Sequence, residues 1–232
     1  MRKIKPTTLA VALAALGGAW LWAPSAYALN TKPMNVADLI RESNQIVVGT
    51  VTSVNQGIGA NRLPYTEVEV NVSESVLGTS GRTLTFRQFG LQDALPASNG
   101  RRYVGLAAGM PQYKAGDAVV LFLGRTSSIG YRTTIGLGHG RFALQSGNLM
   151  NEINNAGLFK DLDLTGKSLN DKEKHLVTTT HGAVGKDTFL AFVRRAIAEK
   201  WWNEPIRKTS TIPQPGSTLA QGGVTAGGSA HE

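Results

Sequence analysis

One short segment matches parts of a cation-binding loop and of a phosphate-binding loop. Asp161, Asp163 and Thr165 match the opening of a calcium-binding loop, in which closely spaced oxygens surround a hard cation. The twelfth position of such a loop should be a Glu that closes the site, but Lys172 stands there. The sequence TGKS at 165–168 also matches the end of a P-loop, yet Asp161 replaces the first glycine of that motif. We therefore retain Asp161, Asp163 and Thr165 as calcium candidates and predict no nucleotide site.

The histidines are the candidates for acid–base chemistry or zinc binding. His139 lies in a glycine-rich run that matches part of a dinucleotide fingerprint, but Arg141 replaces the third glycine. His175 and His181 are six residues apart, and no compact group of His, Asp and Glu accompanies them, as a zinc site would require. The chain has no Cys and no GxSxG motif, which excludes a thiol nucleophile and gives no nucleophile elbow. We predict no catalytic residue and no cofactor from these patterns, and we keep His139 as a binding candidate.

The long segment 90–114 is the candidate recognition loop. It contains Pro and several Gly residues, and a loop of this length inside an ordered domain usually serves a function. Arg101 and Arg102 would supply two cations for anionic groups, and Tyr103 and Tyr113 would supply aromatic contact area. Loops on a rigid scaffold commonly carry binding residues, so we predict that these four side chains contact the ligand or partner.

The first 28 residues have the layout of a secretory signal peptide. Basic residues at positions 2, 3 and 5 precede an uncharged apolar run, Leu9–Trp22, and Ala26-Tyr27-Ala28 then supplies a small-x-small cleavage pattern. The alternative is a retained membrane anchor, but the apolar run is shorter than the roughly 20 residues that span a bilayer. We therefore predict cleavage near Leu29, a periplasmic or secreted mature chain, and no transmembrane span after cleavage.

Charge and composition restrict the partners of the mature chain. The full sequence has a formal net charge of +8, and loss of three basic residues with the leader would leave about +5. The basic residues are spread out, without the cluster that tracks phosphates, so we predict no nucleic acid partner. Mild basicity favours an envelope protein or an anionic glycan as partner, and the oligomeric state stays open. The segment 205–232 is rich in Gly, Pro, Ser, Thr and Ala and is predicted to be a disordered tail.

Seven short runs of β-branched and apolar residues predict the strands. Their ranges are 45–54, 65–76, 82–89, 118–123, 131–135, 141–145 and 149–153. Val68, Val70 and Val72 alternate with polar residues, which indicates an antiparallel sheet with one buried face. Gly49, inside the first run, predicts a bulge or tight bend.

Two helices are predicted to flank these strands. Asn35 is placed to cap a short N-terminal helix, and apolar residues at helical spacing after a cap at Asp187 predict a C-terminal helix. The chain has no Cys, so its core alone must hold the fold. We predict a mainly β fold, a small curved antiparallel barrel of OB type with a short N-terminal helix and a C-terminal helix. The barrel and its C-terminal helix would form one domain over residues 29–204.

Several stretches of this pattern carry a resemblance to known proteins. They are Ile46–Val51, Tyr65–Gly78, Pro111–Leu123 and Gly136–Phe142. In this order they resemble a group of uncharacterised exported bacterial proteins with an OB-type barrel, and more distantly the netrin-like and metalloproteinase-inhibitor domains. The resemblance covers about residues 36–153 and implies the barrel fold. Inhibitor domains of that kind use a disulfide-fixed N-terminal cysteine to reach the target metal, and because this chain has no Cys, that mechanism is not implied.

These observations favour a non-enzymatic exported binding or interaction module of the cell envelope. One alternative is a hydrolase whose site is assembled from distant residues and cannot be read from sequence, with His139 as the candidate base. A second alternative, which rests on fold-level analogy, is a periplasmic partner or regulator of a protease.

Overall fold

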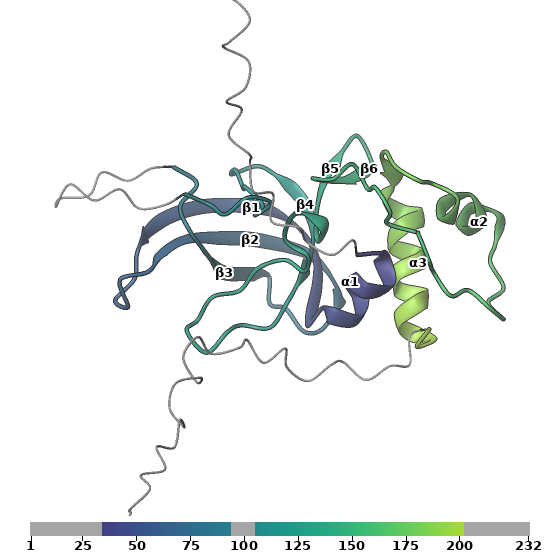
Figure 1. The fold of residues 1–232 in the computed structure, drawn as a ribbon, viewed down its shortest axis with the longest axis horizontal. Helices are drawn as coiled ribbons and strands as arrows, with labels where there is room; N and C mark the ends of the chain where they lie inside the picture. Colours follow the sequence, from purple (N-terminus) through teal and green to yellow (C-terminus); the bar gives the residue numbers. More distant parts are fainter. Residues whose placement is uncertain (1–33, 94–104, 202–232) are drawn as a thin grey trace, which may run out of the picture.

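The computed structural model describes residues 34–93 and 105–201, which form one antiparallel sheet with helices packed against it (Figure 1). The elements are α1 (Val36–Glu42), β1 (Gln45–Ile58), β2 (Pro64–Leu77), β3 (Thr83–Phe89), β4 (Ala118–Leu123), the 3-10 turn η1 (Leu137–His139), β5 (Arg141–Gln145), β6 (Asn148–Asn151), α2 (Asp171–Val177), β7 (Val184–Gly185) and α3 (Lys186–Ala198). The seven strands of the described residues follow the order β3-β2-β1-β4-β5-β6-β7. The predicted mainly β fold with a helix near each end is confirmed, and the predicted leader and tail lie outside the described residues.

The longest element pair is the β1–β2 hairpin, which continues past both predicted strands. Its register shifts between Val48 and Gly49, where the sequence predicted a bulge. A methyl group added at Gly49 would lie 2.5 Å from the carbonyl oxygen of Asn71 on β2. The bend therefore needs glycine because the two backbones approach too closely for any side chain.

Strand β4 is buried on both faces and separates two apolar cores. Its residues Val119 and Leu121 join the smaller core, which β1, β2 and β3 complete. Val120 and Phe122 point the other way, into the larger core beneath α1 and α3. Figure 1 shows α1 and α2 on either side of α3. Aromatic rings run through this larger core and end at Trp201, whose ring meets Phe192 edge-on at 5.3 Å.

The sheet is not closed: its outer strands are β3 and β7, and residues 131–135 contact β3 and the end of β4 through isolated bridges. Residues 131–135 were predicted as a strand, which is wrong. Tyr131 bridges to Arg87 of β3, whereas Thr134 bridges to Leu123 of β4. Because this short segment bonds to β3 through Tyr131 and to β4 through Thr134, neither contact extends into a ladder. The closed OB-type barrel therefore stays a prediction.

The helices differ from the sequence prediction in two ways. Helix α3 begins at Lys186 after a cap at Gly185, so Asp187 lies in its first turn and is not the cap. Helix α2 was not predicted, although Asn170 and Glu173 form a capping box at its start. Within the described residues, no helix combines the length and apolar character needed to cross a bilayer.

Candidate functional site

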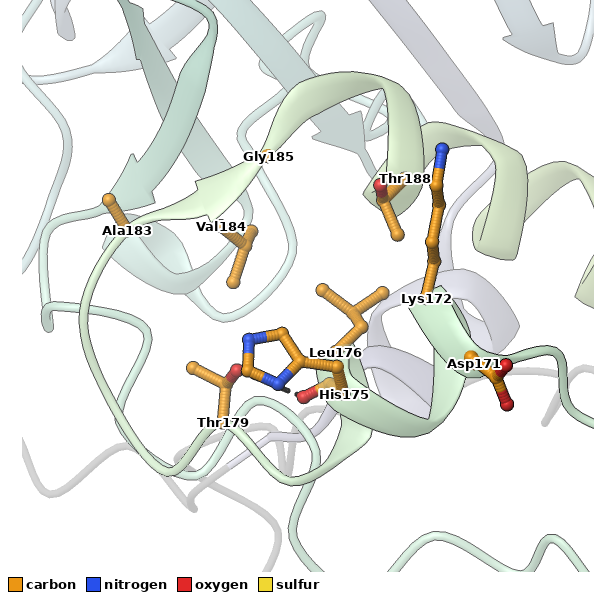
Figure 2. A pocket seen from close by; sticks show the side chains of 9 residues that line it. All are labelled: Asp171, Lys172, His175, Leu176, Thr179, Ala183, Val184, Gly185 and Thr188. Atoms are coloured by element: carbon orange, nitrogen blue, oxygen red, sulfur yellow. Dashed lines mark hydrogen bonds between the residues drawn. The ribbon is translucent and has the colours of Figure 1, made fainter.

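A cavity of about 480 Å³ opens between α2, β7 and the first turn of α3 (Figure 2). Its volume falls within the range of about 300–1,000 Å³ that is typical of small-molecule sites. Its wall consists of Asp171, Lys172, His175, Leu176, Thr179, Ala183, Val184, Gly185 and Thr188. All of these residues come from one stretch of chain that folds back on itself as helix, turn, strand and helix.

Helix α2 presents one face to the cavity. Lys172, His175 and Leu176 follow the helical three- and four-residue spacing that places side chains on a common face. On another face, the buried Glu173 accepts a hydrogen bond from the backbone N–H of Asn170 at 2.9 Å. The same carboxylate forms an ion pair with Arg195 of α3 at 2.7 Å. These two contacts of Glu173 fix the rotation of α2 and turn its remaining face toward the cavity.

Strand β7 and α3 form the opposite wall. Val184 pairs with Leu149 of β6, and this pairing fixes the position from which the chain continues into α3. The next residue, Gly185, leaves open space where a side chain would begin. The first turn of α3 therefore lies open to the cavity and brings the Thr188 hydroxyl to its rim.

The cavity has an apolar floor and a polar rim. Leu176 and Val184 are buried and point into it, while the Lys172 side chain extends toward Thr188 (Figure 2). Asp171 lies at the margin and pairs with Lys174 outside the cavity at 3.0 Å. In the described part of the chain, Lys172 pairs with no carboxylate. The rim therefore carries an excess of positive charge beside an apolar surface.

The arrangement suits binding better than acid–base catalysis. The His175 ring lies beside Thr179, and no carboxylate among the described residues hydrogen-bonds to it. The Thr179 hydroxyl is instead 3.4 Å from the backbone oxygen of His175. A catalytic histidine is normally oriented by a carboxylate or carbonyl on one ring nitrogen and faces a nucleophile with the other. Within residues 34–93 and 105–201, the His175 ring has neither partner.

Of the four binding residues predicted in the loop 90–114, the structure describes Tyr113. Arg101, Arg102 and Tyr103 lie outside the described residues. Tyr113 is only 1% exposed, and its ring contacts Phe86 in the smaller core. Burial raises the pKa of its phenol well above the usual range, although Arg141 opposes this shift. Tyr113 is thus placed to pack the core and offers no outward contact surface.

His139 is also buried, in η1. Its Nδ1 lies 2.7 Å from the carbonyl oxygen of Gly136, and its own carbonyl oxygen accepts a hydrogen bond from Asn151. A base would need one ring nitrogen open to substrate, and burial at 7% exposure limits that access. The surroundings of His139 therefore give the hydrolase alternative no support.

Arg141 links two carboxylates at the mouth of the smaller core. Its guanidinium lies 2.7 Å from Asp117 and 3.8 Å from Glu152, and it also lies over the Tyr113 ring at 5.2 Å. Burial raises the pKa of Glu152, and Arg141 partly offsets this shift. Because the Arg141 guanidinium lies between the two carboxylates, we interpret the cluster as ion pairs that stabilise the fold.

The calcium candidates form a local turn. The Asp163 carboxylate accepts a hydrogen bond from the backbone N–H of Thr165 at 3.1 Å, and this contact lowers the pKa of Asp163. Asp161 has a left-handed backbone, with φ of 55°, in the same turn. Across residues 34–93 and 105–201, no group of three or more His, Cys, Asp and Glu side chains is arranged to hold a metal. Asp161, Asp163 and Thr165 therefore carry no metal proposal.

Comparison with protein-family models, curated proteins and solved structures finds no match for this chain. The candidate site therefore rests on its geometry. The sequence did hold a signal for it, because the capping box at Asn170 and Glu173 marks a helix start. With that helix assigned, Lys172, His175 and Leu176 fall on one face and could have been grouped.

Proposed function

We propose that this chain is a non-enzymatic binding module of the cell envelope, exported by its first 28 residues, that holds a small amphipathic anion in the cavity between α2 and α3. The observation that carries the proposal is the pairing of an apolar floor with an unneutralised cation at the rim. An apolar body would cover Leu176 and Val184, and a carboxylate or phosphate would face Lys172 and Thr188.

The expected affinity follows from the two parts of the cavity. Apolar contact contributes about 25 cal/mol for each Å² removed from water, so covering about 100 Å² yields roughly 2.5 kcal/mol. An exposed ion pair with Lys172 adds about 1 kcal/mol or less. Association also costs translational and rotational freedom, so a simple fatty acid should bind weakly, with a dissociation constant in the millimolar range or above.

The remainder of the fold would serve as the scaffold. We propose that β1 to β4, with residues 131–134, make up the predicted small OB-like barrel. Two observations support this reading: the smaller core lies among these strands, and the bridges at Tyr131 and Thr134 link the edges of β3 and β4. The cavity lies outside that scaffold, beside the larger core.

Titration with octanoate, followed by amide NMR signals of the purified full chain, tests the proposed site. Saturable shifts should concentrate in residues 171–188, and 1-octanol should bind more weakly because it lacks the charge. Ala183→Phe adds bulk at an exposed position on the cavity wall and should weaken octanoate about tenfold or more. Ala115→Phe adds the same bulk at an exposed turn away from the cavity and should leave binding unchanged.

Two results would overturn the proposal. Octanoate and octanol could leave the signals of residues 171–188 unshifted, in which case the cavity is not a site for amphipathic anions. Equal octanoate affinity in the Ala183→Phe and Ala115→Phe variants would place any binding elsewhere. Lys172→Met distinguishes the charged part of the site from the apolar part, because it should weaken the binding of octanoate and leave the binding of octanol unchanged.

A further inference from the structure

A second surface, at the edge of β3, has the character of a protein-docking site. Two hollows of about 250 and 420 Å³ lie there and share Tyr131. The smaller hollow includes Tyr65, Arg87 and Ile129, and the larger includes Phe89. We call the two together the aromatic–arginine surface. It is formed by other residues than the cavity between α2 and α3, so an occupant would be a partner additional to the proposed ligand.

Aromatic side chains form a fixed ridge between the hollows. The rings of Phe89 and Tyr131 meet edge-on with centroids 6.1 Å apart. The Tyr131 hydroxyl donates a hydrogen bond to the carbonyl oxygen of Leu63, which ties the ridge to the β1–β2 hairpin. Arg87 lies over the Tyr65 ring at 4.4 Å and extends this platform. Side chains held in this way lose little freedom on binding, which is why Tyr and Arg are common among binding hot spots.

Apolar groups on this surface are exposed to solvent. Phe89 is 45% exposed and Ile129 is 58% exposed. The wall of the larger hollow adds Met110, Ile135 and Leu137. Single exposed apolar residues are ordinary, but several that adjoin two hollows mark an interaction site.

Every charged side chain that lines the two hollows is an arginine. Arg87 is offset by Glu67, which lies 2.6 Å away. Arg125 is exposed and pairs with no carboxylate in the described part of the chain. Arg132 donates to the carbonyl oxygen of Gly124 and to the side chain of Gln45, and its Nη2 is buried without a hydrogen-bond partner among the described residues, so its guanidinium is not open to a partner. Of the residues that the structure describes here, Arg125 is therefore the cation that this surface presents to solvent without a paired carboxylate, beside apolar hollows.

We infer that the aromatic–arginine surface docks an extended acidic segment of a partner protein, with a carboxylate at Arg125 and an apolar side chain in the larger hollow. Two hollows separated by a ridge suit a linear chain that places one side chain in each. The apolar wall of Met110, Ile135 and Leu137 favours a hydrocarbon side chain over a hydroxyl-rich sugar. A second copy of this chain would bring a net charge of +8 before export, or about +5 after it, which disfavours self-association.

Selection of a displayed library of random peptides, each about twelve residues long, on the purified full chain tests the inference. Enriched peptides should carry several Asp or Glu residues around at least one large apolar residue. Fluorescence anisotropy should then show binding about tenfold weaker or more for Arg125→Glu, because the change removes an attraction and adds a repulsion. Arg82→Glu is the matched control, since it makes the same charge change at an exposed position at the opposite end of β3.

A second pair of variants tests the apolar part. Phe89→Ser removes a 45% exposed side chain from the larger hollow and should weaken the same peptides, whereas Met150→Ser, 43% exposed on β6, should not. Three results would overturn the inference. Selected peptides could show no excess of acidic residues, Arg125→Glu and Arg82→Glu could weaken binding equally, or a heparin hexasaccharide could shift this surface while the peptides do not. The last result would assign the surface to an anionic glycan.

Discussion

Glu173 should hold α2 on α3 and so keep the proposed ligand cavity in shape. Its side chain is 5% exposed and contacts both the start of its own helix and Arg195 of α3. We expect Glu173→Gln to weaken this attachment without removing it, because the amide oxygen can still accept hydrogen bonds. Glu74→Gln is the matched control. Glu74 of β2 pairs with Arg194, the residue next to Arg195 on α3, but both side chains of that pair are exposed.

The size of the effect follows from the two hydrogen bonds that the carboxylate accepts. A hydrogen bond to a charged group contributes about 1.5–3 kcal/mol and one between neutral groups about 0.5–1.5 kcal/mol. Arg195 keeps its own charge, so only the bond from the Asn170 N–H becomes a bond between neutral groups, and neutralising Glu173 should cost about 1–2 kcal/mol. Glu74→Gln removes an exposed ion pair and should cost about 0.5 kcal/mol or less.

The loss should appear first as local opening of α2. This helix has seven residues, of which only Glu173 and Leu176 are buried, so few other contacts hold it. A loss of 1–2 kcal/mol lowers the hydrogen-exchange protection of its amides by a factor of about 5–30. Urea unfolding, amide exchange and octanoate titration of both variants measure these effects. Equal losses in Glu173→Gln and Glu74→Gln, or unchanged exchange in α2, would refute the reasoning.

Two further predictions concern the rest of the fold. Burial raises the pKa of Glu152 above its ordinary 4.5, so ionisation costs the folded state stability as pH rises. In urea unfolding, the free energy of unfolding of Glu152→Gln relative to that of the natural chain should therefore rise between about pH 4 and pH 7. A difference that falls over this range would contradict the raised pKa of Glu152. Gly49→Ala places a methyl 2.5 Å from the Asn71 carbonyl and should destabilise the chain by about 2 kcal/mol or more. Gly81→Ala, which meets only an ordinary 3.8 Å contact, should change stability by about 0.5 kcal/mol or less, and similar losses in the two variants would show that the bulge can relax.

Most of the strands could be predicted because their side chains alternate or form short apolar runs. The prediction for 118–123 coincides with β4, and the Gly49 bend lies where it was expected. Residues 131–135 have a similar composition, but their backbone partners lie on two different strands, β3 and β4, and composition does not reveal partners. Helix α2 was missed because it buries few apolar residues, although Asn170 and Glu173 marked its start.

The candidate site was harder to predict than the fold. Tyr113 was expected to contact a ligand because aromatic residues in loops often do, but its ring turns inward and fills the smaller core. Nothing in a single sequence distinguishes an inward from an outward tyrosine in an irregular segment. The cavity depends on how α2 turns back toward β7, which is set by the pairing of Glu173 with Arg195. Pairing between side chains 22 residues apart is not visible before the fold is known.

The two-sided burial of β4 should make the described part of the chain unfold as one cooperative unit. Val119 and Leu121 stabilise one core and Val120 and Phe122 the other, so the strand cannot leave either core without exposing both. Heat or denaturant should therefore melt the cavity region and the aromatic–arginine surface in a single transition. By mass action, a ligand bound at either place would raise the melting temperature of the whole chain. One thermal scan can thus report occupancy at two places that share no residue.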